Sequence, residues 1–334
     1  MDIPAERIAF VGPRRVEIES FTLPAPGPRQ VLVRATRTLV SAGTELKAYV
    51  GEDVVQRDPP YPRYPGYSHV GVVERAGAAV TEVRVGDRVG TQQTHASRAL
   101  VDLDEEWLQV LPEGVTDDQA TFAVLGSVAM HGLRKAGVRL DETCAVAGQG
   151  VVGQLAAQLA RLGGARPVVA LDPVAERRAS SRESGTDAQL DPAAPDVAAA
   201  VQALTGGRGV DVTLDCTSTS AGFGLLLRLA AVEGRIVIVG SHTGEARFSL
   251  FTEVQRKELS IVGAFQPLAP RRPHPALPWT QAANRQAVLE DIAAGRLRVD
   301  HLISHRAPAA DAAALFRLMA TGQRDWLGVI FVWD

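Results

Sequence analysis

The chain has 334 residues, 46% of them hydrophobic and 22% charged, which predicts a globular protein with room for two domains. A formal net charge of −3 excludes the basic bias of nucleic-acid-binding proteins, and no apolar run approaches the roughly 18 residues of a membrane helix. Two cysteines are too few for a disulfide framework and the start, MDIPAER, does not resemble a signal peptide, so we expect a cytoplasmic protein without a nucleic-acid or membrane partner.

Residues 1–120 are expected to form a β-rich domain. Apolar and polar residues alternate over 31–37, which predicts a strand. We expect further short strands at 71–77, which ends in glycine, and at 83–89, with Gly86 and Asp87 as its turn. The pattern changes near residue 117, where two consecutive aspartates supply acids for the first turn of a helix.

From residue 121, strand and helix patterns alternate. This predicts an α/β domain with a doubly wound parallel sheet and helices on both faces. We expect strands at 144–147, 167–172, 210–215, 235–239 and 259–265, and helices at 150–162, from 175 and at 221–231. After a loop from 266 we expect a helix at 280–294 and a final strand that ends at 333.

The most specific motif is the glycine-rich segment 148–153 (GQGVVG), which follows a predicted strand and opens a predicted helix. Gly148 and Gly150 allow a tight turn and close approach to a pyrophosphate, and Gly153 allows the helix to pack closely on the strand. The first helical residues, Val151 and Val152, would offer free N–H groups to the phosphates. These features predict a bound dinucleotide; the alternative is a tight turn without a ligand.

Further cofactor contacts are predicted at the carboxyl ends of the parallel strands, because ligands of such sheets bind at that edge. Asp172, about 20 residues after Gly150, places a carboxylate where it can accept the ribose hydroxyls of an adenosine. The other residues expected at this edge are Cys216, Thr217, Gly240, Ser241, Ala264 and Phe265.

Four motifs in order resemble those of the medium-chain dehydrogenase/reductase superfamily, which includes alcohol, sorbitol and threonine dehydrogenases. They are 65–73 (PGYSHVGVV), 85–89 (VGDRV), 148–153 (GQGVVG) and 257–263 (KELSIVG). The resemblance implies a GroES-like β domain at 1–120, completed by 266–334, and a Rossmann NAD-binding domain at 121–265.

The zinc-binding motifs of that family are altered in this sequence. The resemblance puts Ala42, Tyr67, Ser68 and Val124 where zinc-dependent members have metal ligands, and none of these is a usual zinc ligand. The four cysteines of a structural zinc lobe are also missing after the second motif. We therefore expect no bound metal at either site.

Tyr67 is the residue that the resemblance directs toward the hydride-transfer site. We expect Tyr67 and Thr44 to donate hydrogen bonds to the substrate oxygen, with Lys47 in support. The alternatives are a Tyr67 that only fills the volume of a lost metal, a Lys47 on the solvated surface, and a Thr44 that caps a helix starting at Glu45.

The expected substrate-contacting residues are Glu45, Ser68, His95 and Trp279. His95 lies in the segment that replaces the structural zinc lobe, and the loop of Trp279 has a family counterpart beside the cleft. His69 is expected to be structural, because in an extended segment it points opposite to Ser68.

Asp172 favours NAD(H), because its charge repels the 2′-phosphate of NADP. Arg177 matches a family position near the adenosine ribose and leaves some tolerance for NADP. The function that follows is a zinc-independent, NAD(H)-dependent alcohol dehydrogenase or ketone reductase, acting on a secondary alcohol of a polyol, cyclitol or specialised-metabolism intermediate.

Two other functions stay open at this point. One is a zinc-free quinone or enoyl reductase that uses NADPH, and the other is a non-catalytic NAD-binding protein. We also expect a homodimer, because in this family the strand expected at 259–265 often pairs with its copy across a twofold axis.

Overall fold

The computed structural model describes residues 2–52, 60–242, 244–275, 278–322 and 326–333. It divides into two compact units, one of residues 1–124, 285–295 and 303–334 and the other of residues 125–284 and 296–302. The second unit therefore contains 266–284 and 296–302, which the sequence analysis placed in the first. One reason is Gln158, whose side chain exchanges two hydrogen bonds with the backbone of Arg298.

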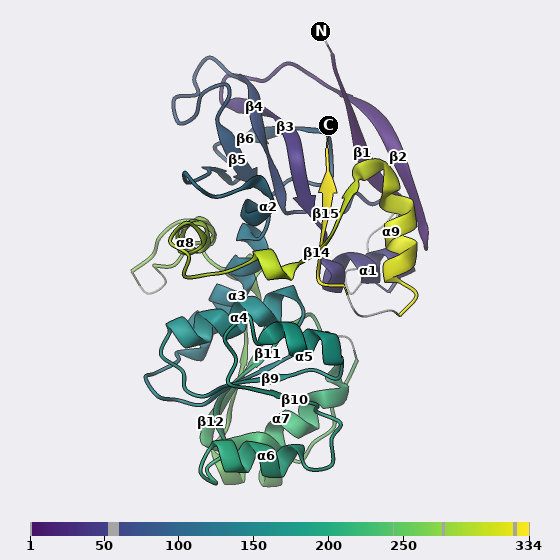
Figure 1. Cartoon of the computed structure of the whole chain (residues 1–334). Coiled ribbons are helices and arrows are strands. Elements are labelled where there is room, and N and C mark those ends of the chain that lie inside the picture. The colour runs from purple at the N-terminus through teal and green to yellow at the C-terminus, as the bar shows by residue number, and fades with distance from the viewer. Residues whose placement is uncertain (1, 53–59, 243, 276–277, 323–325, 334) are drawn as a thin grey trace. The chain divides into compact units, whose positions relative to one another are not determined.

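The first unit contains a two-stranded antiparallel sheet and a seven-stranded sheet (Figure 1). The small sheet pairs β1 (Ile3–Gly12) with β2 (Arg15–Leu23). The larger sheet has the order β14-β15-β3-β4-β5-β7, with β6 paired to β3. Its strands are β3 (Gln30–Leu39), β4 (His69–Ala76), β5 (Arg88–Thr91), β6 (Arg98–Asp102), β7 (Leu108–Val110), β14 (Ile303–Pro308) and β15 (Gly328–Val332).

The helices of this unit are short, and most lie between strands. They are α1 (Ala42–Val50), α2 (Asp117–Ala120) and α9 (Ala312–Met319). Two further helices are shared with the second unit: α3 (Ala123–Ala136) begins here and continues into it, and α8 (Gln281–Ala293) begins there and continues here from Arg285. The expected helix start near Asp117 is confirmed, and Thr116 caps it by accepting a hydrogen bond from the Gln119 N–H.

The expected strand at 83–89 is wrong for most of its length, because β5 begins only at Arg88. A turn precedes it, in which the Asp87 carboxylate accepts the backbone N–H of Arg84. Gly86 has a φ of 95° in this turn, a conformation that glycine adopts without strain.

The second unit is built on a six-stranded sheet with the order β10-β9-β8-β11-β12-β13, in which every pairing is parallel. Its strands are β8 (Cys144–Ala147), β9 (Val168–Leu171), β10 (Ala188–Leu190), β11 (Val210–Asp215), β12 (Ala230–Ile238) and β13 (Ser260–Gly263). Its helices are α4 (Val151–Leu162), α5 (Ala175–Ser181), α6 (Val197–Leu204) and α7 (Phe223–Leu229).

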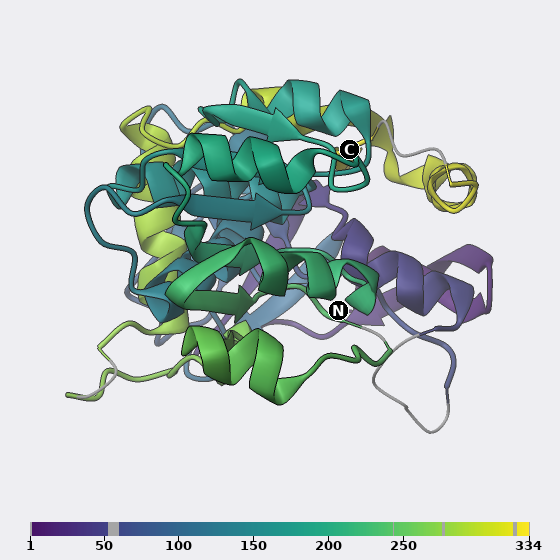
Figure 2. The same ribbon diagram turned by 90° about the horizontal axis from the view of Figure 1, so that it is seen from below.

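Helices cover both faces of this sheet, as the alternating pattern predicted. In Figure 1, α4 and α5 lie above the strands and α6 and α7 below them, and Figure 2 shows the same unit from below. The helix expected at 221–231 ends earlier, at Leu229, because β12 starts at Ala230. Short helical turns lie at Ser220–Gly222, Leu250–Val254, Gln255–Lys257, Gln266–Leu268, Asp300–Leu302 and Ala309–Asp311.

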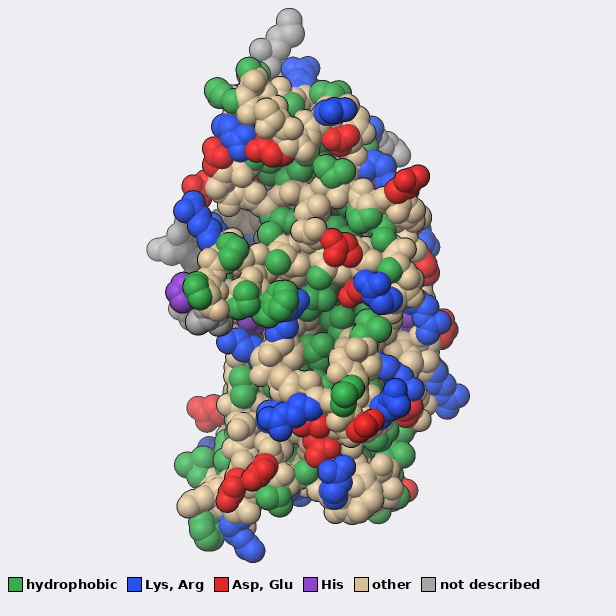
Figure 3. Space-filling view, turned by 90° about the vertical axis from the view of Figure 1, so that its left-hand side faces the viewer, with side chains coloured by type: hydrophobic (Ala, Val, Ile, Leu, Met, Phe, Trp, Pro, Cys, Tyr) green, Lys and Arg blue, Asp and Glu red, His purple; other side chains and the backbone are tan. Residues whose placement is uncertain are grey.

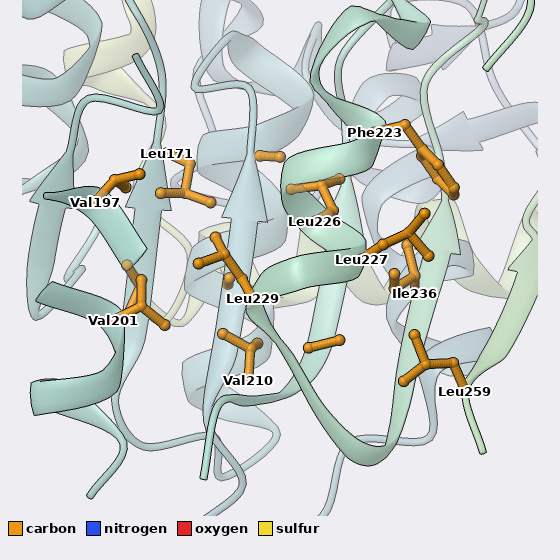
Figure 4. Close-up of a cluster of buried hydrophobic side chains, with 14 residues drawn as sticks. Leu171, Val197, Val201, Val210, Phe223, Leu226, Leu227, Leu229, Ile236 and Leu259 are labelled. Atoms are coloured by element: carbon orange, nitrogen blue, oxygen red, sulfur yellow. The ribbon is translucent and has the colours of Figure 1, made fainter. Parts of the chain in front are cut away.

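A buried apolar cluster holds α6 and α7 against the sheet (Figure 4). Val201 and Leu227 from the helices and Ile236 from β12 are all fully buried in it. Each such side chain contributes about 1.5–3 kcal/mol when it is removed from water. This packing fixes the strands whose carboxyl ends form the candidate cofactor edge.

The surface is of mixed charge. Basic and acidic side chains are interspersed on the face shown in Figure 3. Within the described part of the chain, no helix has both the length and the apolar character needed to cross a membrane.

Candidate active site

The glycine-rich loop between β8 and α4 has the geometry of a phosphate-binding turn. Gly148 has a φ of 83°, and a Cβ at Gly153 would stand 1.7 Å from the carbonyl oxygen of Gly148. A Cβ at Gly150, the N-cap of α4, would meet no atom within 4 Å. The backbone is therefore tightly packed between Gly148 and Gly153, while the space beside Gly150 is open. Val151 and Val152 follow Gly150 as the first helical residues, so their N–H groups are available to a ligand there.

Asp172 faces this loop from the end of β9. Its Oδ2 accepts the backbone N–H of Gln149 at 2.7 Å and its Oδ1 accepts that of Val174 at 2.8 Å. The residue is only 3% exposed, so its carboxylate is held in one orientation. Arg177 lies half-buried on α5, and the neighbouring Arg178 donates to the Asp172 carbonyl.

The loops after β11 and β12 come together beside the glycine-rich turn. A Cβ at Gly240 would lie 1.7 Å from the Thr217 carbonyl oxygen, and one at Gly148 would lie 3.1 Å from the carbonyl of Cys216. The Thr217 hydroxyl donates to Asp215 at 2.7 Å, which orders its loop. These residues are thus gathered at one edge, where Ser241 is exposed after Gly240.

The segment after β13 continues this edge. Ala264 is buried, and its N–H donates to the Ile238 carbonyl at the end of β12. Phe265 is 62% exposed, so its ring is open to a ligand or a partner.

In the first unit, Tyr67 lies against the start of α1. Its hydroxyl donates a hydrogen bond to the Ser41 hydroxyl and lies 3.5 Å from the hydroxyl oxygen of Thr44. Because α1 begins at Ala42, Ser41 occupies the N-cap position and Thr44 is an exposed residue inside the first turn. Thr44 is therefore not a helix cap. Ser41 was not among the predicted site residues, although a serine directly before a helix is a common signal of a helix start.

The environment keeps the Tyr67 phenol protonated. Burial and the nearby Glu45 carboxylate raise the pKa of Tyr67 to about 12, and the hydroxyls of Ser41 and Thr44 offset this only in part. At neutral pH Tyr67 is a hydrogen-bond donor and not a base. Lys47 is half-buried on α1, and its predicted support of Tyr67 stays a prediction.

Three of the predicted substrate residues are buried, and their contact with a substrate stays a prediction. Glu45 is 3% exposed, Ser68 1% and His95 0%. The physical reason for two of them is a mutual contact: Glu45 Oε2 lies 2.9 Å from His95 Nε2. The Glu45 and His95 side chains thus contact each other, while the Ser68 hydroxyl has no hydrogen-bond partner among the described residues.

The remaining predicted residues have ordinary packing partners. Trp279 is 54% exposed, and the guanidinium of Arg134 lies 3.7 Å from its ring centroid. His69 is buried, with its Nδ1 3.1 Å from the hydroxyl of Thr91, and burial lowers the pKa of His69 to about 4. His69 thus has the environment of a neutral structural histidine.

The positions aligned with zinc ligands do not supply zinc donors. Ala42 has only a methyl group, Val124 an isopropyl group, Ser68 a buried hydroxyl, and Tyr67 a phenol that stays protonated. Among the residues that the structure describes, no group of three or more His, Cys, Asp or Glu side chains is arranged to hold a metal ion.

Two protein-family models match the chain. The model of zinc-binding dehydrogenases matches residues 151–282, and the model of the alcohol dehydrogenase GroES-like domain matches residues 27–136. The expected combination of a GroES-like domain with a Rossmann-type parallel sheet is confirmed.

Relatives of known name cover much of the chain. It is 27% identical to an alcohol dehydrogenase of Cupriavidus necator H16, over 95% of both chains. It is 30% identical to D-guloside 3-dehydrogenase of Escherichia coli K12, over 70% of this chain and 67% of the relative. A crystal structure from Sinorhizobium meliloti 1021, assigned as a zinc-binding dehydrogenase and bound to NADP, superposes with a TM-score of 0.83 at 22% identity, over 98% of this chain and 99% of that one.

Proposed function

The chain belongs to the medium-chain dehydrogenase/reductase superfamily and is an oxidoreductase, and from this premise we propose that it is a zinc-independent, NAD(H)-dependent alcohol dehydrogenase or ketone reductase. The observation that carries the proposal is the protonated Tyr67 phenol, which contacts Ser41 and Thr44 where relatives have a zinc ligand.

A nicotinamide dinucleotide fits the residues of the second unit. The closed turn at Gly148, the open position at Gly150 and the tight contact of Gly240 with Thr217 leave room for a pyrophosphate close to the backbone. Asp172 would accept the ribose hydroxyls and repel a 2′-phosphate, which supports NAD(H) over NADP(H). The relative from S. meliloti was solved with NADP, so cofactor preference is a direct test of this reading of Asp172.

The bound nicotinamide would supply the acceptor or donor of the hydride. The protein's own part is to stabilise charge on the substrate oxygen. In the reducing direction, the Tyr67 phenol donates its hydrogen bond and then its proton to the alkoxide formed from the ketone. An alkoxide is a stronger base than a phenolate even when the pKa of Tyr67 is about 12, so this transfer is favourable.

The exposed hydroxyl of Thr44 is the second donor in this proposal. It lies 3.5 Å from the Tyr67 hydroxyl, so one substrate oxygen can contact both groups. Ser41 accepts from Tyr67 and orients the phenol. After proton transfer, the hydroxyls of Ser41 and Thr44 would donate to the phenolate and stabilise it until solvent returns the proton.

Zinc does not fit this site. A metal at the position of the family's ligands would face Ala42 and Val124, which have no donor atom, and two hydroxyl groups that are not ionised. The proposed enzyme therefore relies on Tyr67 and Thr44 for the polarisation that zinc supplies in relatives.

The proposed substrate is a secondary alcohol of a polyol, cyclitol or related metabolic intermediate. The relative named D-guloside 3-dehydrogenase supports this class, since its name specifies oxidation at a sugar ring position. A hydroxyl cluster without a metal suits a small polar molecule whose oxygens accept and donate hydrogen bonds.

The test is a panel of polyols, cyclitols and simple secondary alcohols with NAD⁺ and with NADP⁺, followed by the same assay on Tyr67→Phe. We expect NAD⁺-linked oxidation of at least one cyclic or linear polyol, and a fall in turnover of roughly 10²- to 10⁴-fold in the variant. One zinc per chain by elemental analysis, or unchanged turnover in Tyr67→Phe, would refute the proposal. Reduction of quinones with NADPH would favour the alternative reductase.

A further inference from the structure

Hydrogen bonds link Tyr67 to two buried side chains, the acidic Glu45 and the basic His95. The Tyr67 hydroxyl donates to Ser41 Oγ, and the Ser41 N–H donates to Glu45 Oε1 at 2.8 Å. Glu45 Oε2 lies 2.9 Å from His95 Nε2, and the backbone N–H of His95 donates to the Pro65 carbonyl at 2.8 Å. Pro65 is two residues before Tyr67, so the set returns to its starting segment.

The pair is isolated from water. His95 is fully buried and Glu45 is 3% exposed, and the His95 ring packs edge-on against Phe331 at 5.3 Å. The 2.9 Å between Glu45 Oε2 and His95 Nε2 is a hydrogen-bond distance, so the carboxyl and the imidazole hold each other in place. Nδ1, the other ring nitrogen of His95, has no hydrogen-bond partner among the described residues.

The loop of Tyr67 is shaped around His95. Gly66 has a φ of 101°, and a Cβ there would stand 2.5 Å from the His95 backbone nitrogen and 2.8 Å from Cγ of its imidazole. The imidazole therefore contacts the residue immediately before Tyr67, while Glu45 holds the N-cap residue to which Tyr67 donates. Displacing either member would shift both the phenol and its acceptor.

We infer that Glu45 and His95 form a positioning pair that fixes the Tyr67 phenol against Ser41 for proton donation. This rests on the proposed function of Tyr67. The pair does not touch the substrate; it sets the distance between two segments that are far apart in the sequence. A misplacement of about 1 Å at a reacting group costs about 10²-fold in rate, so this role is measurable.

The experiment compares His95→Leu, His95→Gln and the double variant His95→Leu/Tyr67→Phe. We expect His95→Leu to lower kcat by roughly 10- to 100-fold with little change in NAD affinity, measured by tryptophan fluorescence. His95→Gln keeps a donor near the Nε2 position and should recover much of the loss. The double variant should be no slower than Tyr67→Phe alone, because both changes remove the same interaction.

The matched control is His69→Leu, which removes another fully buried imidazole from the same unit. If His95→Leu acts only by disturbing the fold, His69→Leu should lower kcat by a similar factor. The loss of kcat in His95→Leu should then also multiply with the loss in Tyr67→Phe. These results would overturn the inference. A crystal structure of His95→Leu gives a readout independent of activity. An intact Tyr67–Ser41 contact there would also overturn it.

The two proposals fail in different ways. If Tyr67 moves in His95→Leu but the wild type oxidises no alcohol, the positioning role stands and the proposed function falls. If His95→Leu does not fold, Glu45→Gln replaces it, since it keeps an acceptor for the Ser41 N–H and removes the charge. Tyrosinate absorbance, taken as the difference from Tyr67→Phe, should then appear at lower pH than in the wild type. An unchanged titration would show that Glu45 does not act on Tyr67.

Discussion

The carboxylate of Asp172 accepts the backbone N–H of Gln149 at 2.7 Å, which joins the end of β9 to the glycine-rich turn. The same side chain therefore shapes the phosphate loop and faces the proposed ribose site. Asp172→Asn keeps one acceptor oxygen but removes the charge. We expect the ratio of kcat/KM for NAD⁺ over NADP⁺ to fall about tenfold or more, because a charge-assisted hydrogen bond of about 1.5–3 kcal/mol is weakened.

Asp191→Asn is the control for this measurement. Asp191 is a nearby carboxylate that contacts Arg178 at 3.5 Å, and its loss changes the local charge by the same amount. An unchanged cofactor ratio in Asp172→Asn would show that Asp172 supports the loop without selecting the ribose.

Substitution by alanine should have different effects at Gly153 and Gly150, on stability at the first and on NAD binding at the second. A methyl group at 153 would stand 1.7 Å from a backbone oxygen, so Gly153→Ala should lower the free energy of unfolding by roughly 1–3 kcal/mol. Gly150→Ala meets no atom within 4 Å and should unfold nearly as the wild type does, but its methyl group would occupy the pyrophosphate position. Urea unfolding and NAD titration separate the two effects. Equal NAD affinity of Gly150→Ala and the wild type would argue against a pyrophosphate at this turn.

The glycine-rich turn could be predicted from the sequence, whereas the contacts around Tyr67 could not. The roles of Gly148 and Gly153 depend on local backbone geometry, so a six-residue motif specifies them. The contact of Tyr67 with Ser41 and that of Glu45 with His95 join three segments of the first unit, and no local pattern specifies such pairs. For the same reason the burial of Glu45 and His95 could not be predicted, since it depends on how those segments pack.

Some short helices and strands were also not predicted from the sequence. The strand β10 has three residues, too few for a periodic signal, and α6 was not expected. The strand expected at 83–89 begins only at Arg88, while the turn expected at Gly86 and Asp87 is present, because the Asp87 carboxylate accepts the N–H of Arg84. The long, strongly patterned strands and the crossover helix α4 were predicted within a few residues.

His69 should make the protein less stable in acid. Burial lowers its pKa to about 4 in the folded state, against about 6.5 in an unfolded chain. The unfolded state therefore binds more protons between these values, and stability present above pH 6.5 is lost as the pH falls through about 4. The full difference corresponds to about 3 kcal/mol. Urea unfolding at pH 7 and pH 4.5 should show a smaller loss in His69→Leu, while His274→Gln, at an exposed position, should behave as the wild type does. An equal pH dependence of His69→Leu and the wild type would contradict this assignment.

The strand β13 lies at one of the two edges of the parallel sheet, and its exposed Ile261 provides a test of the predicted dimer. An edge strand has unpaired backbone groups on one side, and pairing with its copy across a twofold axis would satisfy them. Ile261→Lys places two like charges near such an axis and should weaken the dimer by roughly tenfold or more. Leu204→Lys is the matched control, because Leu204 is equally exposed, at 38%, but lies at the end of α6. Light scattering over a dilution series measures both. A wild-type monomer at all concentrations would exclude the dimer, and equal weakening by both lysines would show that charge alone, and not the edge of β13, governs association.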